Sequence, residues 1–537
     1  MNHDQSLCAR AFFNSLLGKF QIEGFSMICY SIISKSDSML IPIMFALRKA
    51  GGGRSSRGGF LECLSSRYRS ARPQLSPWFP ARTPSTRTPL FWPYGKHQRH
   101  GFRWLALNPC PQPEGNRMKN RMLKSLVLQV LVVGGVISSE LLDAAHAESS
   151  ATVLVQEYLG SGLIGEADEQ LLALTAATAN NADAQLGLGL VRSARAFEKL
   201  AQSLYRVGFA SKAVGYQSLV DLPAPIPYNP NPDPITYDEF RAILTTYIAD
   251  LEAADQVLKG VGERSAKLSV DLSAARIDWN GDGRLGPEDG LGLAISDIDE
   301  NGNAKPFVVG FDTADAKWLR GYCNLLMAVT KAWLSHDFSE TWNYSFRLLF
   351  PRAVSTMSAA DSEQGQKLLG VERAQADDLA DLITLVHTLR WPVRDKARWG
   401  EVRDHLRTVI ALNRETWALI GKEADDDHEW LPGPRQKSGV LPSFNVTEER
   451  VQAWLGLLSD FESVLDGKLL IPHWRFAKGV DAAKLFDEPQ PFDLVLWVTG
   501  PAALPYLSDG PVMTADEWNQ LLAIFEGNFA AYAFYFN

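Results

Sequence analysis

Hydrophobic residues recur at helical spacing along most of the chain beyond residue 150. In the stretch 183–207, one face of a helix collects Leu186, Leu190, Ala194, Leu200 and Leu204. The same spacing predicts further helices over the ranges 152–175, 314–336, 373–390, 397–420, 447–465 and 514–533. The pattern therefore indicates a mainly α fold, a multi-helix assembly whose paired helices suit a solenoid-like stack.

Strand patterns are confined to two short segments. The residues "KLSVDL" at 267–272 alternate Leu268, Val270 and Leu272 with polar side chains, and "PFVVGF" at 306–311 is a short β-type run. Because these segments flank an acidic stretch, we expect them to pair around it. The sequence thus predicts one short β insertion that carries an acidic loop within the helical fold.

A proline-rich segment divides the helical part of the chain. The residues "DLPAPIPYNPNPDP" at 221–234 favour an extended link, because proline lacks the N–H that a helix interior uses. Directly after it, Thr236 and Glu239 have the spacing of a capping box, which predicts the start of another helix. We therefore expect an N-terminal helical region with its link over 148–235 and a main helical domain over 236–537.

A signal peptide pattern occupies residues 118–147. An apolar run at 126–137 is preceded by Lys119, Arg121 and Lys124 and followed by the small-residue ending "AHA" at 145–147. The run is too short to span a bilayer, so we expect no membrane span after cleavage. An alternative is that residues 126–137 form a buried helix. The preferred interpretation predicts bacterial export, to the periplasm or the medium, and a mature chain that begins at Glu148.

Residues 1–117 precede this pattern and differ from the rest of the chain in composition. They mix Gly, Ser, Pro and Arg without a sustained hydrophobic period, and Lys and Arg far outnumber Asp and Glu. Because a signal peptide works at the N-terminus, we interpret this stretch as a mis-called or disordered extension. The alternative is a genuine basic arm that contacts nucleic acid.

Charge and cysteine content narrow the choice of partners. The whole chain has a net charge of −9, and without the basic extension the remainder is more acidic still. An acidic protein is a poor partner for nucleic acid or anionic membranes and is compatible with cation binding. Cys323 is the only cysteine beyond residue 147, so the mature chain has no intramolecular disulfide. We expect Cys323, in "WLRGYCNLLMAV", to be a small core residue.

The acidic loop itself has the pattern of a calcium-binding loop. In "DWNGDGRLGPED", the ligand positions of an EF-hand-type loop are taken by Asp278, Asn280, Asp282, the carbonyl of Arg284, and Asp289. Gly283 stands where the loop turns, and Leu285 stands where such loops place an apolar anchor. Ca²⁺ requires six to eight oxygen ligands, which alternate residues on a tight turn provide. The alternative is a solvated turn, rich in Asp and Asn, that binds no metal.

This loop resembles the calcium loops of dockerin modules. Position 12 is Asp in place of the usual Glu, and the segment before the loop alternates like a strand, both as in that family. A second, incomplete loop is indicated by Asp297, Asp299 and Asn301, but its twelfth position is Val308, so Asp312 or Asp315 would have to supply the last ligand. The alternative for this segment is an Asn-Gly turn between short strands. Since dockerins pair two loops, their scaffold-docking function is not expected to carry over to this chain.

Three other segments resemble a group of bacterial exported proteins with no assigned activity. They are "WLRGYCNLLMA", "LIPHWRF" and the C-terminal "FDLVLWVTGPAALPYL" with "FYFN". This resemblance implies no mechanism.

Catalytic motifs are absent from the sequence, which contains no G-x-S-x-G, H-E-x-x-H, Walker A loop or G-x-G-x-x-G before a helix. Two polar clusters remain, "DDDHE" at 425–429 and "HWR" at 473–475. The preferred hypothesis is an exported, calcium-binding helical protein that presents a surface to a protein partner, with the calcium structural. The alternative is a periplasmic hydrolase or metalloenzyme that combines the 425–429 acids with His473.

Overall fold

The computed structural model describes residues 149–177, 181–209, 226–286, 289–290, 305–355, 373–437, 439–440, 445–526 and 529–537. Among these residues are thirteen α-helices and three pairs of short antiparallel strands, which confirms the predicted mainly α fold. The predicted extension at 1–117, the predicted signal peptide at 118–147 and the second candidate loop at 297–303 lie outside the described residues.

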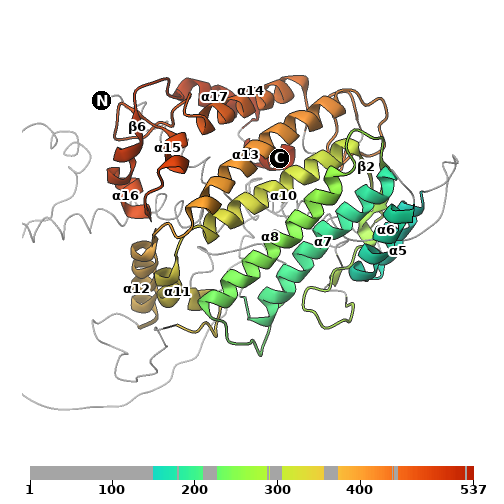
Figure 1. Ribbon diagram of the computed structural model, residues 1–537, viewed down its shortest axis with the longest axis horizontal. Helices are drawn as coiled ribbons and strands as arrows, with labels where there is room; N and C mark the ends of the chain where they lie inside the picture. Colours follow the sequence, from blue (N-terminus) through green and yellow to red (C-terminus); the bar gives the residue numbers. More distant parts are fainter. Residues whose placement is uncertain are drawn as a thin grey trace, which may run out of the picture. The chain divides into compact units, whose positions relative to one another are not determined.

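Four long helices form the centre of the fold. Lying side by side in chain order, they are α7 (Ala182–Arg206), α8 (Tyr237–Lys259), α10 (Thr313–Leu334) and α13 (Lys396–Ile420) (Figure 1). At each start a side chain accepts a main-chain N–H that has no partner within the helix, and the capping residues are Asn181, Thr236, Asp312 and Asp395. The predicted capping box of Thr236 and Glu239 is present.

Two shorter helices, α5 (Ser150–Gly160) and α6 (Ile164–Ala177), pack against α7. The prediction of a single helix over 152–175 is therefore wrong, because the chain turns between α5 and α6. Gly162 has a φ of +68°, a left-handed conformation that glycine adopts without a steric penalty. The hydrophobic pattern continues through this turn because α5 and α6 bury their apolar faces against the same core.

The predicted β insertion is confirmed. Strand β1 (Lys267–Asp271) pairs antiparallel with β2 (Val308–Asp312), with Val270 opposite Val309. Gly310 also donates its N–H to the carbonyl of His428, 3.2 Å away, so the 428–430 segment lies along the outer edge of β2. A Cβ atom at Gly310 would lie 2.9 Å from the carbonyl oxygen of Asp427, which is why this position requires glycine.

The remaining elements are short, except for the longer helices α12 and α14. The helices are α11 (Ser339–Ser345), α12 (Arg373–Thr388), α14 (Glu448–Leu465), α15 (Ala482–Asp487), α16 (Leu494–Thr499), α17 (Ala515–Ile524) and α18 (Phe529–Phe536). The strand pairs are β3 (Arg390–Trp391) with β5 (Phe492–Asp493) and β4 (Gly479–Val480) with β6 (Leu507–Ser508). The 3-10 turns are η1 (Leu272–Ala274), η3 (Phe346–Leu348) and η5 (Pro501–Tyr506).

The C-terminal helix α18 lies in the core. The ring of Phe536 packs on Trp417 of α13, with ring centres 4.7 Å apart, and on Trp454 of α14. The single helix predicted over 514–533 is wrong, because α17 ends before Phe525 and Glu526 has a φ of +52°. The main hydrophobic cluster extends from Ala151 to Phe536, so described residues of both predicted regions, 148–235 and 236–537, share one core.

Cys323 is buried on α10, as predicted for a core residue, and burial raises the pKa of its thiol to about 12. Along the described part of the chain, no helix combines the length and apolarity needed to cross a membrane.

Candidate functional site

The acidic loop at 278–289 is closed at its base by main-chain contacts. Ile277 donates its N–H to the carbonyl of Asp289, 2.9 Å away, and Arg276 forms an isolated antiparallel bridge with Gly290. Residues 287 and 288 lie outside the described residues. The first and last positions of the predicted calcium loop are therefore adjacent, as a loop that encloses an ion requires.

Side-chain oxygens at alternate positions accept the N–H groups of the loop. The carboxylate of Asp278 accepts from Gly281 at 2.7 Å and from Gly283 at 3.0 Å. The amide oxygen of Asn280 accepts from Asp282 at 2.9 Å, and Asp282 in turn accepts from Arg284 at 2.8 Å. Each of these three side chains therefore points toward main-chain N–H groups of the loop itself. They are the residues that the sequence pattern assigns to positions 1, 3 and 5.

The last ligand position and the turn also follow the pattern. Asp289, which is 1% exposed, accepts the N–H of Gly286 at 2.8 Å. Gly283 has a φ of +69°, the left-handed conformation expected of a glycine at the turn.

Two side chains of helix α7 contact the start of the loop. Gln202 donates to the carbonyl of Asp278 at 2.8 Å, and the carboxyl of Glu198 accepts the N–H of the same residue. The pKa of Glu198 is raised to about 7, mainly by burial; the charge of Arg195 opposes this rise and that of Asp278 adds to it. Sequence patterns did not identify Glu198 or Gln202, because they lie about 80 residues before the loop and their spacing fits any helix.

The donor set has the chemistry that Ca²⁺ prefers. Asp278, Asp282 and Asp289 would supply carboxylate oxygens, Asn280 an amide oxygen and Arg284 a carbonyl, so every predicted ligand is a hard oxygen. Within the described ranges, however, no group of three or more His, Cys, Asp and Glu side chains is placed closely enough to hold a metal ion. The residue types fit calcium, and binding requires the side chains to draw closer together than they stand.

The polar cluster predicted from the sequence at 425–429 is fixed by contacts with β1, with β2 and with its own loop. Lys267 forms ion pairs with Asp425, at 2.5 Å, and with Asp427. The hydrogen bond from Lys267 lowers the pKa of Asp425 below its usual value. On the same loop Asp426 accepts the N–H of Lys437 at 3.0 Å, and a ring nitrogen of His428 contacts the carbonyl of Val308.

A set of buried acids lies beside this loop: it includes Glu429 of the predicted cluster and the two candidates for the last ligand of the second loop, Asp312 and Asp315, and the sequence did not predict that they gather here with Glu423. Asp312 and Asp315 form the capping box of α10, and the carboxyl of Asp312 is hydrogen-bonded to that of Glu423. Two carboxyl groups share a hydrogen bond only when one of them carries a proton. Burial raises the pKa of all four neighbouring acids, to about 8 for Glu423, to about 7 for Glu429 and well above the usual value for Asp315.

The "HWR" cluster at 473–475 caps the C-terminus of α16. A ring nitrogen of His473, the indole N–H of Trp474 and the guanidinium of Arg475 contact the successive carbonyls of Trp497, Val498 and Thr499, at 3.1, 3.0 and 2.5 Å. The other ring nitrogen of His473 accepts the N–H of Arg475 at 3.2 Å. These partners differ from those of the 425–429 acids, so the structure does not join the two halves of the predicted enzyme site.

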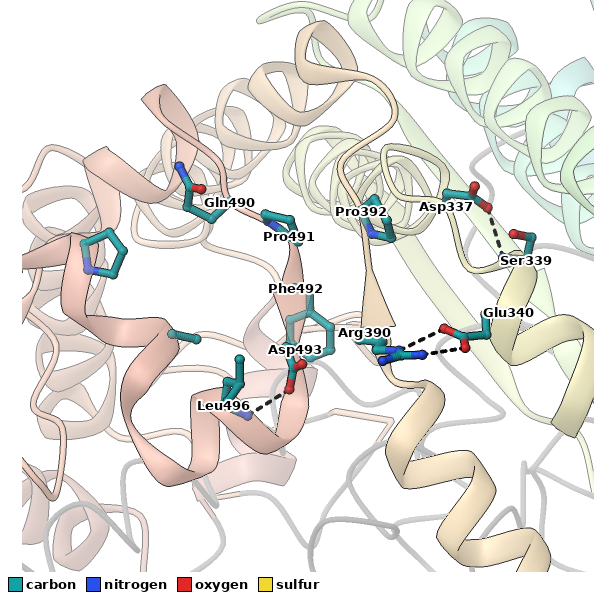
Figure 2. Close-up of a pocket in the computed structure, with 12 residues that line it drawn as sticks. Asp337, Ser339, Glu340, Arg390, Pro392, Gln490, Pro491, Phe492, Asp493 and Leu496 are labelled. Carbon is teal, nitrogen blue, oxygen red and sulfur yellow. Dashed lines mark hydrogen bonds and ion pairs between the residues drawn. The ribbon is translucent and has the colours of Figure 1, made fainter.

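A pocket of about 550 Å³ lies where β3, β5, α11 and α16 meet (Figure 2). Its polar side chains already have partners: Arg390 is paired through two hydrogen bonds with Glu340, at 2.7 and 2.9 Å, and Asp493 accepts the N–H of Leu496. Between them the wall is apolar, formed by Phe492 and several prolines. The described residues of the lining include no histidine, cysteine or lysine, and the one hydroxyl, that of Ser339, lies beside the carboxylate of Asp337.

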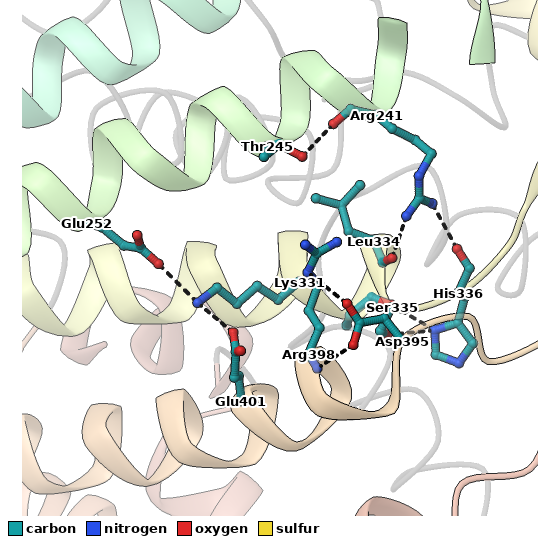
Figure 3. A network of polar contacts seen from close by, with 11 residues as sticks. Arg241, Thr245, Glu252, Lys331, Leu334, Ser335, His336, Asp395, Arg398 and Glu401 are labelled. Carbon is teal, nitrogen blue, oxygen red and sulfur yellow. Dashed lines mark hydrogen bonds and ion pairs between the residues drawn. The ribbon is translucent and has the colours of Figure 1, made fainter. Parts of the chain in front are cut away.

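A network of ion pairs and hydrogen bonds joins α8, α10 and α13 (Figure 3). Lys331 of α10, 8% exposed, forms ion pairs with Glu252 of α8 at 3.1 Å and Glu401 of α13 at 3.0 Å. Arg241 donates to the carbonyls of Leu334 and His336 at the end of α10. Such contacts hold neighbouring helices in register, which indicates a structural role.

The candidate site of the chain is thus the acidic loop on α7, with the pocket as a separate apolar surface. No protein-family model, curated protein or solved structure matches this chain.

Proposed function

We propose that this protein binds Ca²⁺ in the loop 278–289 and that the ion has a structural role. The observation that carries the proposal is the conformation of the loop. Its ends are joined by the hydrogen bond from Ile277 to Asp289, and the oxygens of Asp278, Asn280 and Asp282 turn back over it. Asp278, Asn280, Asp282, the carbonyl of Arg284 and Asp289 would hold the ion, and a divalent cation would offset the repulsion among the three carboxylates.

The ligand set argues for weak binding. Asp289 is one methylene shorter than the Glu common at this position, so two-oxygen contact with the ion is harder and water completes the shell. We therefore expect a dissociation constant on the order of 10⁻⁵ to 10⁻³ M, nearer to that of extracellular modules than to that of cytosolic buffers. A second ion at Asp297, Asp299 and Asn301 stays a prediction, because those residues lie outside the described ranges.

Calorimetric titration of chelator-stripped protein tests the proposal. We expect heat on addition of CaCl₂ and a rise in melting temperature, since the unfolded chain cannot gather these oxygens. At about 100 times the dissociation constant the stabilisation is roughly 2.7 kcal/mol. Asp282→Ala should remove most of it, whereas Asp509→Ala, at an exposed acid paired with Lys478, should not. Absence of both heat and thermal shift at millimolar calcium in the unsubstituted protein would refute calcium binding.

We also propose that the protein is exported from a bacterial cell and binds a protein partner. Exposed apolar side chains on and after α16, next to the pocket, support a binding role, and they are Val495, Leu496, Val498 and Leu504.

A further inference from the structure

The pocket where β3, β5, α11 and α16 meet has an apolar wall that is open to solvent. Three prolines of this wall are exposed, and they are Pro392, Pro491 and Pro505. Leu496 is 43% exposed, and the ring of Phe492 is half-buried among these residues (Figure 2). The volume of about 550 Å³ falls within the roughly 300–1,000 Å³ that is typical of small-molecule sites. A ligand of that size would gain free energy by covering this apolar surface.

The charged groups among the described residues of the lining are three carboxylates and one guanidinium. Arg390 donates two hydrogen bonds to Glu340, and they lower the pKa of Glu340 below its usual value. Burial opposes a similar change at Asp337, but hydrogen bonds and the nearby charge of Arg394 lower its pKa as well. Both acids are therefore ionised at neutral pH, and negative charge predominates in the lining.

Asp493 is the acid of the lining with the most capacity for a ligand. One of its oxygens accepts the N–H of Leu496 at 2.8 Å, as the cap of α16. A carboxylate accepts several hydrogen bonds, so this contact leaves room for a further donor. Glu340, by contrast, contributes both of its oxygens to Arg390. Because Asp493 directly follows Phe492, its carboxylate lies at the edge of the apolar wall (Figure 2).

We propose that this pocket binds a small molecule with an apolar body and one cationic group, such as an arylalkylamine. The apolar body covers the wall, and the cationic group donates to Asp493. An anionic ligand fits less well, because Arg390 is already held by Glu340 and the other charged groups of the lining would repel it. The inference is independent of calcium binding, since the residues of the pocket and those of the loop 278–289 are different.

Titrations followed by ligand-observed NMR test the proposal with three probes that share a phenyl ring and differ in charge. They are phenethylamine, which is cationic at neutral pH, phenethyl alcohol, which is neutral, and hydrocinnamate, which is anionic. We expect phenethylamine to bind about three- to fivefold more tightly than phenethyl alcohol, the effect of one ion pair at an accessible site. Hydrocinnamate should bind most weakly, because its carboxylate meets charges of the same sign.

Asp493→Asn tests the contact with the cationic group. Asparagine caps a helix as well as aspartate does, so the variant loses the charge and keeps the start of α16. It should bind phenethylamine about three- to fivefold more weakly and phenethyl alcohol as before. Asp481→Asn makes the same change at the cap of α15, outside the lining, and is the matched control. It should bind both probes like the unsubstituted protein.

Leu496→Ala tests the apolar wall. Since this side chain is 43% exposed, the variant should fold, and it should bind phenethylamine and phenethyl alcohol more weakly by the same factor. Val498→Ala is the matched control, because Val498 is 39% exposed on the same helix and is not part of the lining. It should leave the affinity for both probes unchanged.

Four results would overturn the proposal. The first is the absence of binding of all three probes at millimolar concentration, and the second is equal or tighter binding of hydrocinnamate. The third is an equal effect of a pocket variant and its control, which would place the binding elsewhere. The fourth is binding of Nα-acetyl-lysinamide as tight as that of phenethylamine, which would assign the cationic group to a lysine of a protein. All four leave calcium binding untouched.

Discussion

Asn413 of α13 shows how a single buried polar residue organises the end of the chain. Its amide donates to the carbonyls of Phe536, at 2.7 Å, and Asn537, at 2.9 Å, and its oxygen accepts the indole N–H of Trp454 at 2.7 Å. The side chain is 2% exposed, and its donors and its acceptor are all in use. One amide therefore connects α13, α14 and the last residues of the sequence.

Asn413→Ala should destabilise the fold by about 3 kcal/mol or more, because it leaves an indole N–H and two carbonyls buried without a partner, each at roughly 1–3 kcal/mol. Denaturant unfolding followed by tryptophan fluorescence measures the loss. Asn231→Ala, at an exposed asparagine, is the control and should change stability by less than about 0.5 kcal/mol. An equal, small effect of both changes would show that Asn413 is not important for packing.

At the scale of elements, the long helices could be predicted because each combines a one-sided apolar pattern with a capping residue. The short helix α16 could not, since "LVLWVT" is apolar throughout and has no period. Its start is capped by Asp493, but its end is held by His473, Trp474 and Arg475, some twenty residues earlier. Contacts of that kind depend on the tertiary fold and leave no local pattern.

The candidate site could likewise be predicted only where its residues are close together in the sequence. The ligand positions from Asp278 to Asp289 are local, and the pattern placed them in one closed loop, as the structure has them. The supporting residues on α7 and the buried acids beside Asp312 come from distant segments. At the sequence level Asp312 and Asp315 are indistinguishable from ordinary helix caps, because burial by other elements is what raises their pKa.

The buried acids at the N-terminus of α10 predict a pH dependence. The pKa of Glu423 is raised to about 8 by burial first and then by Asp312, to which it is hydrogen-bonded. A folded-state pKa above the unfolded value means that the folded state binds the proton more tightly. Its contribution to stability is then complete below about pH 4 and is lost as the pH rises towards 8.

Glu423→Gln removes this titration while keeping the shape of the side chain. Relative to the unsubstituted protein, the variant should gain stability between pH 5 and pH 8.5, by about 1–2 kcal/mol once solvent screening at this half-buried position is allowed for. Urea unfolding at the two pH values provides the measurement. The pKa of Asp425 is lowered and that of Lys267 is raised, so both groups keep their charges between pH 5 and pH 8.5. They therefore do not contribute to the change in stability over this window. A difference that does not change with pH would contradict the assignment.

At the scale of the whole molecule, the N-terminal part of the chain gives a prediction about processing. Helix α5 begins at Ser150 and is capped by Ser149, whose hydroxyl accepts the N–H of Thr152 at 3.2 Å. Cleavage after Ala147 leaves this cap intact. N-terminal sequencing of protein purified from its native cell should therefore find Glu148 first, and Ala147→Arg should block cleavage. Native protein that retains residues 1–117 would contradict this.

The position of α18 has a consequence for the timing of folding. Until residues 529–537 have left the ribosome, Trp417 and Trp454 lack the ring of Phe536, and Asn413 lacks its main-chain partners. At the usual rate of synthesis, a nascent chain needs roughly 20 to 80 s to pass from residue 150 to residue 537. Throughout that interval the core is incomplete and its aromatic surface is open to chaperones. If the protein is exported as proposed, this incomplete core would keep the precursor competent for translocation during synthesis.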